Sequence, residues 1–485
     1  MNSEKISALF TDFYELTMAQ GYWKTGKNGR AVFEMFFRRH PFGGGFSIFA
    51  GLETLLENLS GFVFSKNDIE YLRGLNFFED GFLDYLKDFR FTGTLYAMDE
   101  GSVIFPQEPL VRIDGGLIEC QIIEGIVLNT INFQSLIATK TARVVLAASG
   151  GGIMEFGMRR AQGPDGALQA SRASYIGGAA GTSNVLAGKK YGIKVMGTMA
   201  HSWVMSFGSE EEAFRTYANL YPVHPIFLID TYDTLKSGVL NAIKVGREIS
   251  LNGGTFGVRL DSGDMDYLSK EVRKKLDAAG FLNATIAVSN DLDENIITTL
   301  VNHKAPINSW GVGTQMVTGG GDPAFTGVYK LMALEKDGKL TPSIKFSDNP
   351  EKTTNPGVKQ VWRIFGDCGP AADILALDEN YHAESTGKPK IGTSPSFWHP
   401  CADYRHFNQL IEKEPVAMLK KYMENGRQIC TNPTLDEIQK RCISELASFD
   451  PSFKRLLNPH IYKVAITERL REQKLNLIKN YLGDL

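Results

Sequence analysis

Hydrophobic and polar residues alternate with different rhythms along the chain, beginning with a mixed pattern. Residues 31–38 alternate with a period of two, which predicts a strand, and residues 40–59 indicate a turn followed by an amphipathic helix. Residues 91–116 contain short apolar runs broken by glycine and proline, which is typical of a small sheet or barrel. A long helical pattern covers residues 119–148. Residues 1–140 therefore predict a mixed α+β N-terminal domain.

From about residue 150 the pattern becomes one of alternating short strands and helices. The strands are expected at residues 152–157, 174–178, 193–199, 226–230, 255–264, 284–291 and 308–318, with one more at 329–335. Strands that alternate with helices at this spacing indicate βα units and a parallel sheet. We therefore expect an α/β fold in which residues 141–340 form an irregular, TIM-like (β/α) barrel packed against the N-terminal domain. A doubly wound open sheet is the alternative.

The last part of the chain, residues 341–485, carries more loops than the middle. It ends in a helical pattern over residues 466–482. We expect a C-terminal helical and loop extension that completes the barrel and packs on the N-terminal domain.

Composition excludes some classes of partner. The chain has 485 residues, 43% hydrophobic and 22% charged, with a net charge of −3, so no overall basic field favours nucleic acid or an anionic membrane. The five cysteines form no CxxC pair, which is typical of reduced thiols. The N-terminus lacks the apolar segment of a signal peptide, and no run of 18 apolar residues occurs. We expect a cytoplasmic protein without a membrane span.

Polar residues follow the expected strands in succession, where a barrel would place its active site. They are Arg159 and Arg160, Thr198 and His201, Asp230 and Asp233, Arg259, Asp261 and Asp264, Asn290, Asp291 and Asp293, and Gly313, Thr314 and Thr318. Guanidinium groups bind phosphate in bidentate fashion, carboxylates hold Mg²⁺ directly or through water, and glycine- and threonine-rich turns present donors to phosphate oxygens. The set predicts phosphate or pyrophosphate chemistry, with residues 311–322 as a phosphate loop.

Each of these residues also has a purely structural explanation. A histidine after a strand is more often a satisfied structural residue, and an aspartate there is often the cap of the next helix. The glycines of residues 40–47 lack the GK[ST] of a phosphate-binding P-loop, and His399, Cys401 and His406 fit no zinc spacing. The functional reading depends on the joint occurrence of polar groups after successive strands.

Nine motifs in order make the chain similar to the nicotinate phosphoribosyltransferase family. They include LFTDFYELTMAQGYW, FEMFFRRHPFGGGFSIFAGLE, MEFGMRRAQGPDG, GTMAHSWVMSF, LIDTYDT, GVRLDSGD and SNDLDE. The resemblance runs from residue 8 to about 335 and continues more loosely to the C-terminus. It implies a type II phosphoribosyltransferase fold and a homodimer with sites shared between subunits.

The resemblance also implies the reaction. Nicotinate and phosphoribosyl pyrophosphate would give nicotinate mononucleotide and pyrophosphate in pyridine nucleotide salvage, driven by ATP, with Mg²⁺ on the leaving group. His201 would be the histidine that ATP phosphorylates, Asp230 its orienting acid, and Asp261 would lie near the ribose hydroxyls and metal. No metal ligand is assigned directly, because pyrophosphate would hold most of the Mg²⁺, with Asp230 or Asp261 as candidates.

The same resemblance assigns the substrate contacts. The nicotinate ring would stack between Phe156 and a Tyr14 supplied by the second subunit. Thr198 would hydrogen-bond the nicotinate, Arg159 and Arg259 would pair with its carboxylate and with the phosphate of the product, and Arg38, with Arg39, would reach phosphate. Ser183 stands where nicotinamide-using relatives carry an aspartate, and the absence of that charge favours an acid substrate.

Three alternatives remain open at this point. The acceptor could be nicotinamide or quinolinate, or the barrel could be an inactive binding protein, although the presence of His201, Asp230, Arg259 and Asp261 argues against inactivity. Without the resemblance, the residues predict only a barrel enzyme acting on a phosphorylated sugar, with an aldolase or isomerase as competitor. The lack of an obvious Schiff-base lysine at a strand end weakens the aldolase alternative.

Overall fold

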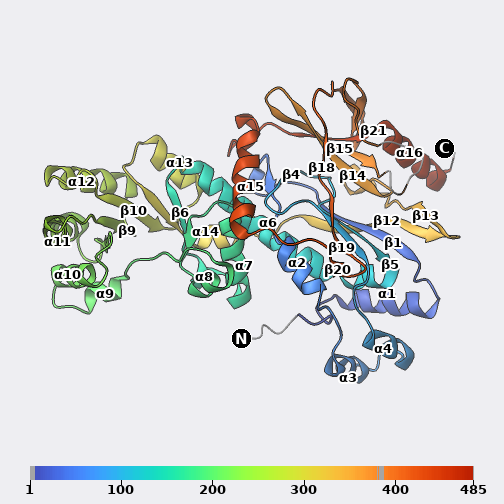
Figure 1. Ribbon diagram of the computed structural model, residues 1–485, viewed down its shortest axis with the longest axis horizontal. Helices are drawn as coiled ribbons and strands as arrows, with labels where there is room; N and C mark the ends of the chain where they lie inside the picture. The colour runs from blue at the N-terminus through green and yellow to red at the C-terminus, as the bar shows by residue number, and fades with distance from the viewer. Residues whose placement is uncertain (1–5, 379–380, 382–386, 484–485) are drawn as a thin grey trace. The chain divides into compact units, whose positions relative to one another are not determined.

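The computed structural model of the protein describes residues 6–378, 381 and 387–483. The chain divides into two compact units (Figure 1). Unit 1 comprises Met1–Leu136 and Ala324–Leu485, and unit 2 comprises Ile137–Pro323. The sequence placed divisions near residues 140 and 340, whereas the units divide after Leu136 and after Pro323. The C-terminal stretch thus belongs to the same compact unit as the N-terminal stretch.

Unit 1 is built on a seven-stranded sheet that joins both ends of the chain. Its strand order is β13 (Lys339–Pro342), β12 (Gly327–Lys336), β1 (Arg30–Phe37), β5 (Val111–Gly116), β3 (Thr94–Ala97), β19 (Lys420–Glu424) and β20 (Arg427–Gln428). The expected strand at residues 31–38 is confirmed as β1, but every residue from Ala31 to Phe37 is buried. Both faces of β1 are therefore covered. A two-stranded pair, β2 (Ser47–Ile48) and β4 (Val103–Ile104), completes this part.

A second sheet of unit 1 corrects the expected helical and loop extension. Six strands lie in the order β17 (Ala402–Asn408), β16 (Ser396–His399), β21 (Lys463–Thr467), β15 (Gly369–Leu377), β14 (Lys359–Gly366) and β18 (Val416–Ala417). The strand pattern was missed because charged residues interrupt it: Lys359, Arg363 and Asp373 are buried inside β14 and β15. Two helices, α15 (Leu435–Ser448) and α16 (Glu468–Leu482), confirm the helical part of the expectation for this region.

The helices of unit 1 contribute apolar side chains to its core. They are α1 (Phe13–Lys24), α2 (Leu52–Leu59), α3 (Lys66–Gly74), α4 (Asp80–Lys87), α5 (Leu117–Ile122), α15 (Leu435–Ser448) and α16. The long helix expected over residues 119–148 is α5 followed by α6 (Glu124–Ala147). By length and composition Leu117–Ala147 could cross a membrane, but 67% of its most apolar window is buried inside the protein, as in a core helix.

Unit 2 contains a six-stranded sheet in which every pairing is parallel. The order is β7 (Gly181–Thr182), β6 (Gly152–Glu155), β11 (Ser309–Val312), β10 (Thr285–Asn290), β9 (Gly257–Leu260) and β8 (Ile226–Leu228). A single parallel bridge adds Val195 beside Thr182. Within the part of unit 2 that the structure describes, no ladder joins the Val195 edge to β8. The parallel α/β sheet is confirmed, and closure into a barrel stays a prediction.

Two strands expected in the barrel lie elsewhere. Residues 174–178 end the helix α7 (Gly163–Ile176), and the strand follows at β7. The short apolar run there was read as a strand, but it is the buried face of a helix end. Residues 329–335 fall within β12, which pairs antiparallel with β1 in unit 1. The series of parallel strands in unit 2 therefore ends at β11, one strand earlier than the sequence predicted.

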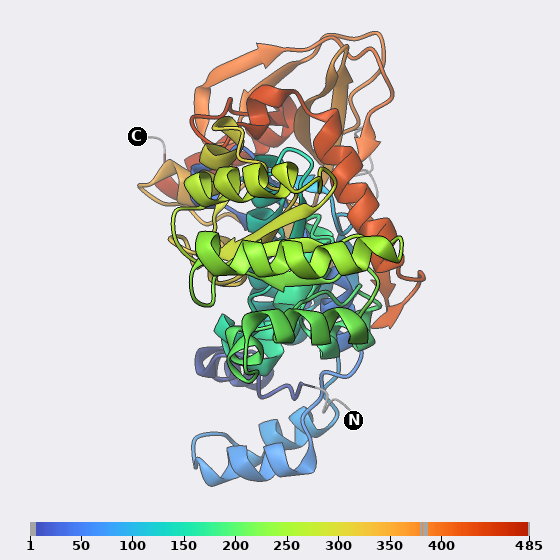
Figure 2. The same cartoon turned by 90° about the vertical axis from the view of Figure 1, so that its left-hand side faces the viewer.

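Helices flank the strands of unit 2, as the alternating pattern predicted. They are α7, α8 (Val185–Tyr191), α9 (His201–Met205), α10 (Glu210–Leu220), α11 (Val239–Leu251), α12 (Met265–Ala278), α13 (Glu294–Asn302) and α14 (Thr314–Val317). Figure 2 shows α10, α11 and α12 side by side, in colours from green to yellow-green. Aspartate caps begin several of them: Asp264 accepts from the Tyr267 N–H, and Asp293 from the N–H groups of Asn295 and Ile296.

Candidate functional site

The carboxyl ends of the parallel strands surround one polar cavity of unit 2. Its volume is about 510 Å³, within the range of small-molecule sites. Its walls come from the loops after β6, β7, β9, β10 and β11 and from the segment that leads to α9, and they include Phe156, Arg159, Ser183, Thr198, His201, Arg259, Asp261, Asn290, Asp291, Gly313 and Thr314. In open and closed α/β sheets alike, this end of the strands carries the ligand.

A buried carboxylate fixes the turn that presents Phe156. Glu155 is 1% exposed at the end of β6 and accepts hydrogen bonds from the Gly157 N–H, the Ser171 hydroxyl and the Thr182 hydroxyl. The Phe156 N–H donates to the Val312 carbonyl over 2.8 Å. The ring lies against β11, where a Cβ on Gly311 would come within 2.5 Å of it. Phe156 is therefore a fixed apolar wall in an otherwise polar cavity.

His201 is the first residue of α9 and lies between a hydroxyl and a carboxylate. Its Nδ1 is 3.1 Å from the Thr231 hydroxyl. Its Nε2 is 3.6 Å from Oδ2 of Asp261, which is too long for a direct hydrogen bond. The side chain is 40% exposed, so it is accessible from solvent.

Asp230 and Asp261 form a linked pair at the ends of β8 and β9. One oxygen of Asp230 accepts from the Asp261 N–H over 2.8 Å and from the Ser262 hydroxyl over 2.7 Å. Its other oxygen is buried and has no hydrogen-bond partner. Asp261 in turn accepts from the Ser289 hydroxyl. The expected contact of Asp230 with the His201 ring is not among the contacts of the described residues, and the carboxylate nearest that ring is Asp261.

Arg259 points from β9 to the segment that precedes His201. Its guanidinium donates to the Thr198 hydroxyl and, over 2.9 Å, to the Met199 carbonyl. Its Nε is buried without a partner. Burial lowers the pKa of Arg259, while Asp261 and Asp230 oppose that shift. The group is thus a desolvated cation with unused donor capacity, which favours an anionic ligand.

The remaining predicted residues of unit 2 differ in exposure and contacts. Arg159 lies in an exposed turn at the rim of the cavity. Gly313 and Thr314 line the cavity at the start of α14, and their binding of phosphate stays a prediction. Thr318 ends that helix, and its hydroxyl donates to the Thr314 carbonyl over 2.7 Å and accepts from the Gly320 N–H. Thr318 therefore shapes the loop and is not a wall of the cavity.

Sequence reasoning did not single out two residues of the site, Ser289 and Thr231, and it gave no sign of the backbone conformation of a third, Asn290. Ser289 and Thr231 hold Asp261 and His201 through hydroxyl groups, and hydroxyls in strand-end loops carry no distinctive pattern. Asn290 was noted for its position, but its backbone has a φ of 123°, far outside the usual range for a residue with a side chain. Strain of this kind gathers at functional sites.

Tyr14 and Arg38 are in unit 1. Tyr14 lies on α1 and is 50% exposed. Partial burial and the nearby carboxyl of Glu15 raise its pKa. Arg38 follows β1, and its N–H faces the Thr326 hydroxyl over 3.4 Å. The structure describes a single chain, so the assignment of these two residues to nicotinate and phosphate across a dimer stays a prediction.

Three family models match consecutive parts of the chain. The model described as the nicotinate phosphoribosyltransferase N-terminal domain matches residues 9–132. The model of the nicotinate phosphoribosyltransferase family matches residues 152–381, and that of the C-terminal domain matches residues 358–474.

Individual relatives agree with these models over nearly the whole chain. The chain is 40% identical over 476 residues to the nicotinate phosphoribosyltransferase of Bacillus subtilis, covering 97% of this chain and 95% of that protein. It is 41% identical over 470 residues to nicotinate phosphoribosyltransferase pncB2 of Mycobacterium tuberculosis, covering 96% and 93%. The crystal structure of the human nicotinic acid phosphoribosyltransferase superposes with a TM-score of 0.84 at 30% identity, over 96% of this chain and 99% of the human chain.

Proposed function

This chain belongs to the nicotinate phosphoribosyltransferase family of enzymes, and we propose that it joins nicotinate to phosphoribosyl pyrophosphate in a reaction coupled to ATP. The products would be nicotinate mononucleotide and pyrophosphate, with ADP and phosphate from the coupled step. The observation that carries this proposal is the cavity at the strand ends, where His201, Arg259 and Asp261 come together.

The glycosyl transfer needs positioning more than covalent catalysis. The ring nitrogen of nicotinate attacks C1 of the ribose while the bond from C1 to the pyrophosphate oxygen breaks, and pyrophosphate leaves with both electrons. Phe156 offers one face for the pyridine ring, and Thr198 offers a hydroxyl beside it. Arg259 and Arg159 supply positive charge for the carboxylate and the product phosphate. Holding the two reactants in line supplies much of the rate enhancement.

ATP coupling is proposed to pass through His201. The Thr231 hydroxyl at Nδ1 leaves Nε2 to attack the γ-phosphorus of ATP, and ADP departs as the bond to its β-phosphate oxygen breaks. The nearby carboxylate of Asp261 would stabilise the positive charge that develops on the ring as the N–P bond forms, and water would later cleave that bond, releasing phosphate and restoring His201. Asp230 acts through the Asp261 backbone and Ser262, so its predicted role as the direct orienting acid is better assigned to the Asp261 loop.

Magnesium fits this site as an ion that arrives with the substrates. Among the described residues, no group of three or more histidine, cysteine, aspartate or glutamate side chains could hold a metal by itself. The unpartnered oxygen of Asp230 and the carboxylate of Asp261 are the donors available to such an ion or its waters. When bound, Mg²⁺ would neutralise the pyrophosphate leaving group.

The finer arrangement also belongs to this proposal. We propose a homodimer in which Tyr14 and Arg38 of one subunit complete the site of the other, supported by the half-exposed ring of Tyr14. Among the described strands of unit 2, each pairs with its neighbour in the chain, β6 also pairs with β11, and only β7 and β8 are not paired with each other. This is the order of strands around a barrel that is open at one place, which supports the TIM-like architecture. The buried α6 and five free cysteines support a cytoplasmic location.

An initial-rate assay with three acceptors tests the proposal. The enzyme is supplied with phosphoribosyl pyrophosphate, Mg²⁺ and ATP, and nicotinate, nicotinamide and quinolinate are offered in separate reactions while mononucleotide and ADP are quantified. We expect product from nicotinate with release of ADP. Ser183 lines the cavity where an aspartate would repel the acid, so nicotinamide is expected to be a poor substrate.

Other outcomes would contradict specific parts of the proposal. Product from nicotinamide would show that Ser183 does not set the choice of acceptor. Product from nicotinate without ADP would remove the ATP coupling and the role of His201. No product from any of the three acceptors would favour the inactive binding protein.

A further inference from the structure

A buried group of three charged residues joins α6 to α13 in unit 2, and the proposed reaction does not use it. Glu294, the first residue of α13, is 2% exposed. One of its carboxylate oxygens accepts a hydrogen bond from the Lys140 ammonium over 2.5 Å, and the other accepts one from the Nε–H of Arg143 over 2.9 Å. Both cations lie on α6 and are 5% and 3% exposed. We call Lys140, Arg143 and Glu294 the α6–α13 triad.

The triad keeps an ionised carboxylate inside the protein. Burial alone would raise the pKa of Glu294, but Lys140 and Arg143 hold that pKa below its ordinary value. Burying three charges removes each of them from water, so such a group contributes little net stability compared with apolar side chains of similar size. The position of the triad therefore needs a reason other than stability.

The residues before Glu294 form a strained turn in the wall of the unit 2 cavity. Asn290 and Asp291 both line that cavity. Asn290 ends β10 with a φ of 123°, and its carbonyl accepts the Leu292 N–H over 2.8 Å. The Asp293 carboxylate then caps α13. A residue with a side chain keeps such a φ only where the surrounding structure imposes it.

Both ends of this turn are held. On the strand side, Asn290 pairs with Val312 of β11. The preceding Ser289 donates its hydroxyl hydrogen to Asp261. On the helix side, the chain enters α13 at Glu294, and the triad ties that residue to α6. The Asn290 backbone is thus fixed between β11 and α6, with three residues between it and the triad.

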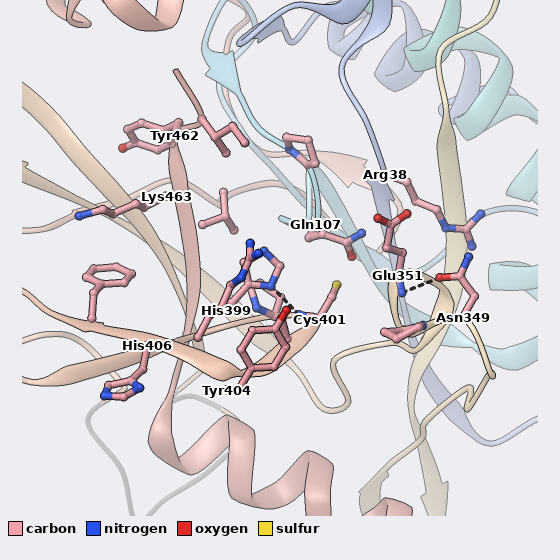
Figure 3. A pocket seen from close by; sticks show the side chains of 18 residues that line it. Arg38, Gln107, Asn349, Glu351, His399, Cys401, Tyr404, His406, Tyr462 and Lys463 are labelled. Atoms are coloured by element: carbon pink, nitrogen blue, oxygen red, sulfur yellow. Dashed lines mark hydrogen bonds between the residues drawn. The ribbon is translucent and has the colours of Figure 1, made fainter. Parts of the chain in front are cut away.

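The cavity of unit 1 gives a contrast. It lies around His399, Cys401 and Tyr404 (Figure 3) and has a volume of about 580 Å³. Its lining includes Arg38, for which a role with substrate phosphate is already proposed, so we count it with the proposed shared site. Lys463 in the same lining is exposed, as most lysines are, and solvent satisfies it. The triad of unit 2 is buried, and solvent does not explain it.

We propose that Glu294 is a positioning residue: through the α6–α13 triad it fixes the turn after β10, and this turn presents Asn290 and Asp291 to the ribose of phosphoribosyl pyrophosphate. The amide and the carboxylate of these two residues suit the hydroxyl groups of a ribose. The inference rests on the proposed function, since it names the substrate that this wall contacts. The turn at Phe156 is held by Glu155 instead, so the nicotinate face does not depend on the triad.

Two substitutions in the full chain test the proposal, and each replaces a buried carboxylate by an amide of the same shape. Glu294→Gln removes the negative charge of the triad. Asp373→Asn is the matched control, because Asp373 is buried and pairs with Arg363 in unit 1. Hydrogen exchange measured by mass spectrometry follows the turn and the start of α13. Initial rates give the KM values for phosphoribosyl pyrophosphate and for nicotinate.

In Glu294→Gln, the peptide that contains the N–H groups of Leu292 and Ile296 should exchange at least about tenfold faster than in the wild type, because the turn loses one of its two anchors. The KM for phosphoribosyl pyrophosphate should rise about tenfold, since the wall no longer keeps its position beside the ribose. The KM for nicotinate should stay within about twofold of its wild-type value. Asp373→Asn should leave the exchange of this peptide and both KM values unchanged, although it lowers the free energy of unfolding.

The proposal is overturned if this peptide exchanges in Glu294→Gln as it does in the control. It is also overturned if the KM for phosphoribosyl pyrophosphate rises no more than that for nicotinate, because a general loss of structure would raise both. A wild-type enzyme that makes no nicotinate mononucleotide would contradict the proposed function instead, and the exchange measurement would still decide whether Glu294 holds the turn. If Glu294→Gln does not fold, the double variant Glu294→Gln with Lys140→Met keeps the net charge of the triad unchanged and should show the same changes.

Discussion

Charged side chains are used in opposite ways in the β14–β15 pair of unit 1 and in the strand-end site of unit 2. In unit 1 Arg363 and Asp373 are 3% and 0% exposed and join through two hydrogen bonds of 2.9 and 2.7 Å. At the strand ends of unit 2, Arg259 and Asp230 each keep one buried polar atom without a partner. His201 lies 3.6 Å from Asp261 instead of bonding to it.

This difference separates charges that serve the fold from charges that serve a ligand. A buried charge without a partner costs folding free energy, so it persists where another requirement maintains it. The paired groups of β14 and β15 complete their own hydrogen bonds and have little left to offer a ligand. The unit 2 groups remain available, and they lie where parallel strands end.

The largest effect is expected at His201, and it should fall on activity alone. His201→Ala removes the proposed phosphoryl acceptor. The rate of nicotinate-dependent ADP release should fall by on the order of 10³-fold or more, while slow transfer without ATP persists. The free energy of unfolding should barely change, because the ring is 40% exposed and has few partners. Rate assays with radiolabelled ATP and urea unfolding measure the two quantities.

His303→Ala is the control for that substitution. His303 is also in unit 2, is 57% exposed and contacts a carboxylate, Asp266, at 3.2 Å. The His303→Ala substitution should leave both ADP release and nicotinate turnover near their wild-type rates. If His201→Ala kept full ADP release, the phosphohistidine step would have to be abandoned.

For the buried pair Arg363 and Asp373 of unit 1, we expect the substitution to change the free energy of unfolding. Arg363→Met leaves Asp373 buried beside Glu108 and without its guanidinium partner. We expect a loss of about 3–5 kcal/mol in the free energy of unfolding, measured by urea denaturation. Arg427→Met, at an exposed strand position, should change it by less than about 0.5 kcal/mol. If the two substitutions changed the free energy of unfolding equally, the Arg363–Asp373 pair would contribute nothing to stability, and the contrast between paired and unpaired charges would fail.

Tyr14 sharpens the comparison, because it is a unit 1 residue with a proposed role in binding. Tyr14→Ala removes the ring that would stack on nicotinate, so the KM for nicotinate should rise about tenfold, or ~1.4 kcal/mol. The KM for ATP should stay within about twofold of its original value. Tyr14→Phe keeps the ring and should behave like the wild type in steady-state assays. Equal increases in both KM values after Tyr14→Ala would show that the residue does not stack on the pyridine ring.

Much of the parallel sheet of unit 2 could be predicted from sequence, because each βα unit is local. The pattern located β6, β8, β9, β10 and β11 within a few residues. It also located the strand at residues 329–335 but assigned it to the wrong sheet, because its partner β1 lies about 300 residues earlier in the chain. It also failed for β14 and β15, where buried Lys359, Arg363 and Asp373 imitate the polarity of a loop. Local patterns do not reveal which distant residue neutralises a charge.

The site was predictable to a similar degree. The strand-end pattern predicted that five residues lie together, and all five line the same cavity: His201, Arg259, Asp261, Gly313 and Thr314. The partners of these residues were not predictable, since Thr231, Ser262 and Ser289 act through single hydrogen bonds. The direct neighbour of the histidine is Asp261, a distinction that depends on loop geometry of a few ångströms.

The smallest expected effect concerns an exception within unit 1, where two carboxyls lie together. Burial and the neighbouring Glu15 raise the pKa of Glu124 to about 7, and burial raises that of Glu15 as well. A carboxyl whose pKa is raised by folding stabilises the protein below its unfolded pKa, and this contribution is lost as pH rises through the folded pKa. Stability should therefore decline between about pH 4.5 and about 7.

Urea unfolding of Glu124→Gln should show a weaker decline in the free energy of unfolding over that interval, because one of the two coupled protons is gone. Glu57→Gln, on the exposed side of α2, should keep the wild-type slope. If the free energy of unfolding of Glu124→Gln changed with pH as it does in the wild type, Glu15 and Glu124 would be as well neutralised by their surroundings as Arg363 and Asp373. The carboxyl pair would then be no exception among the buried charges of unit 1.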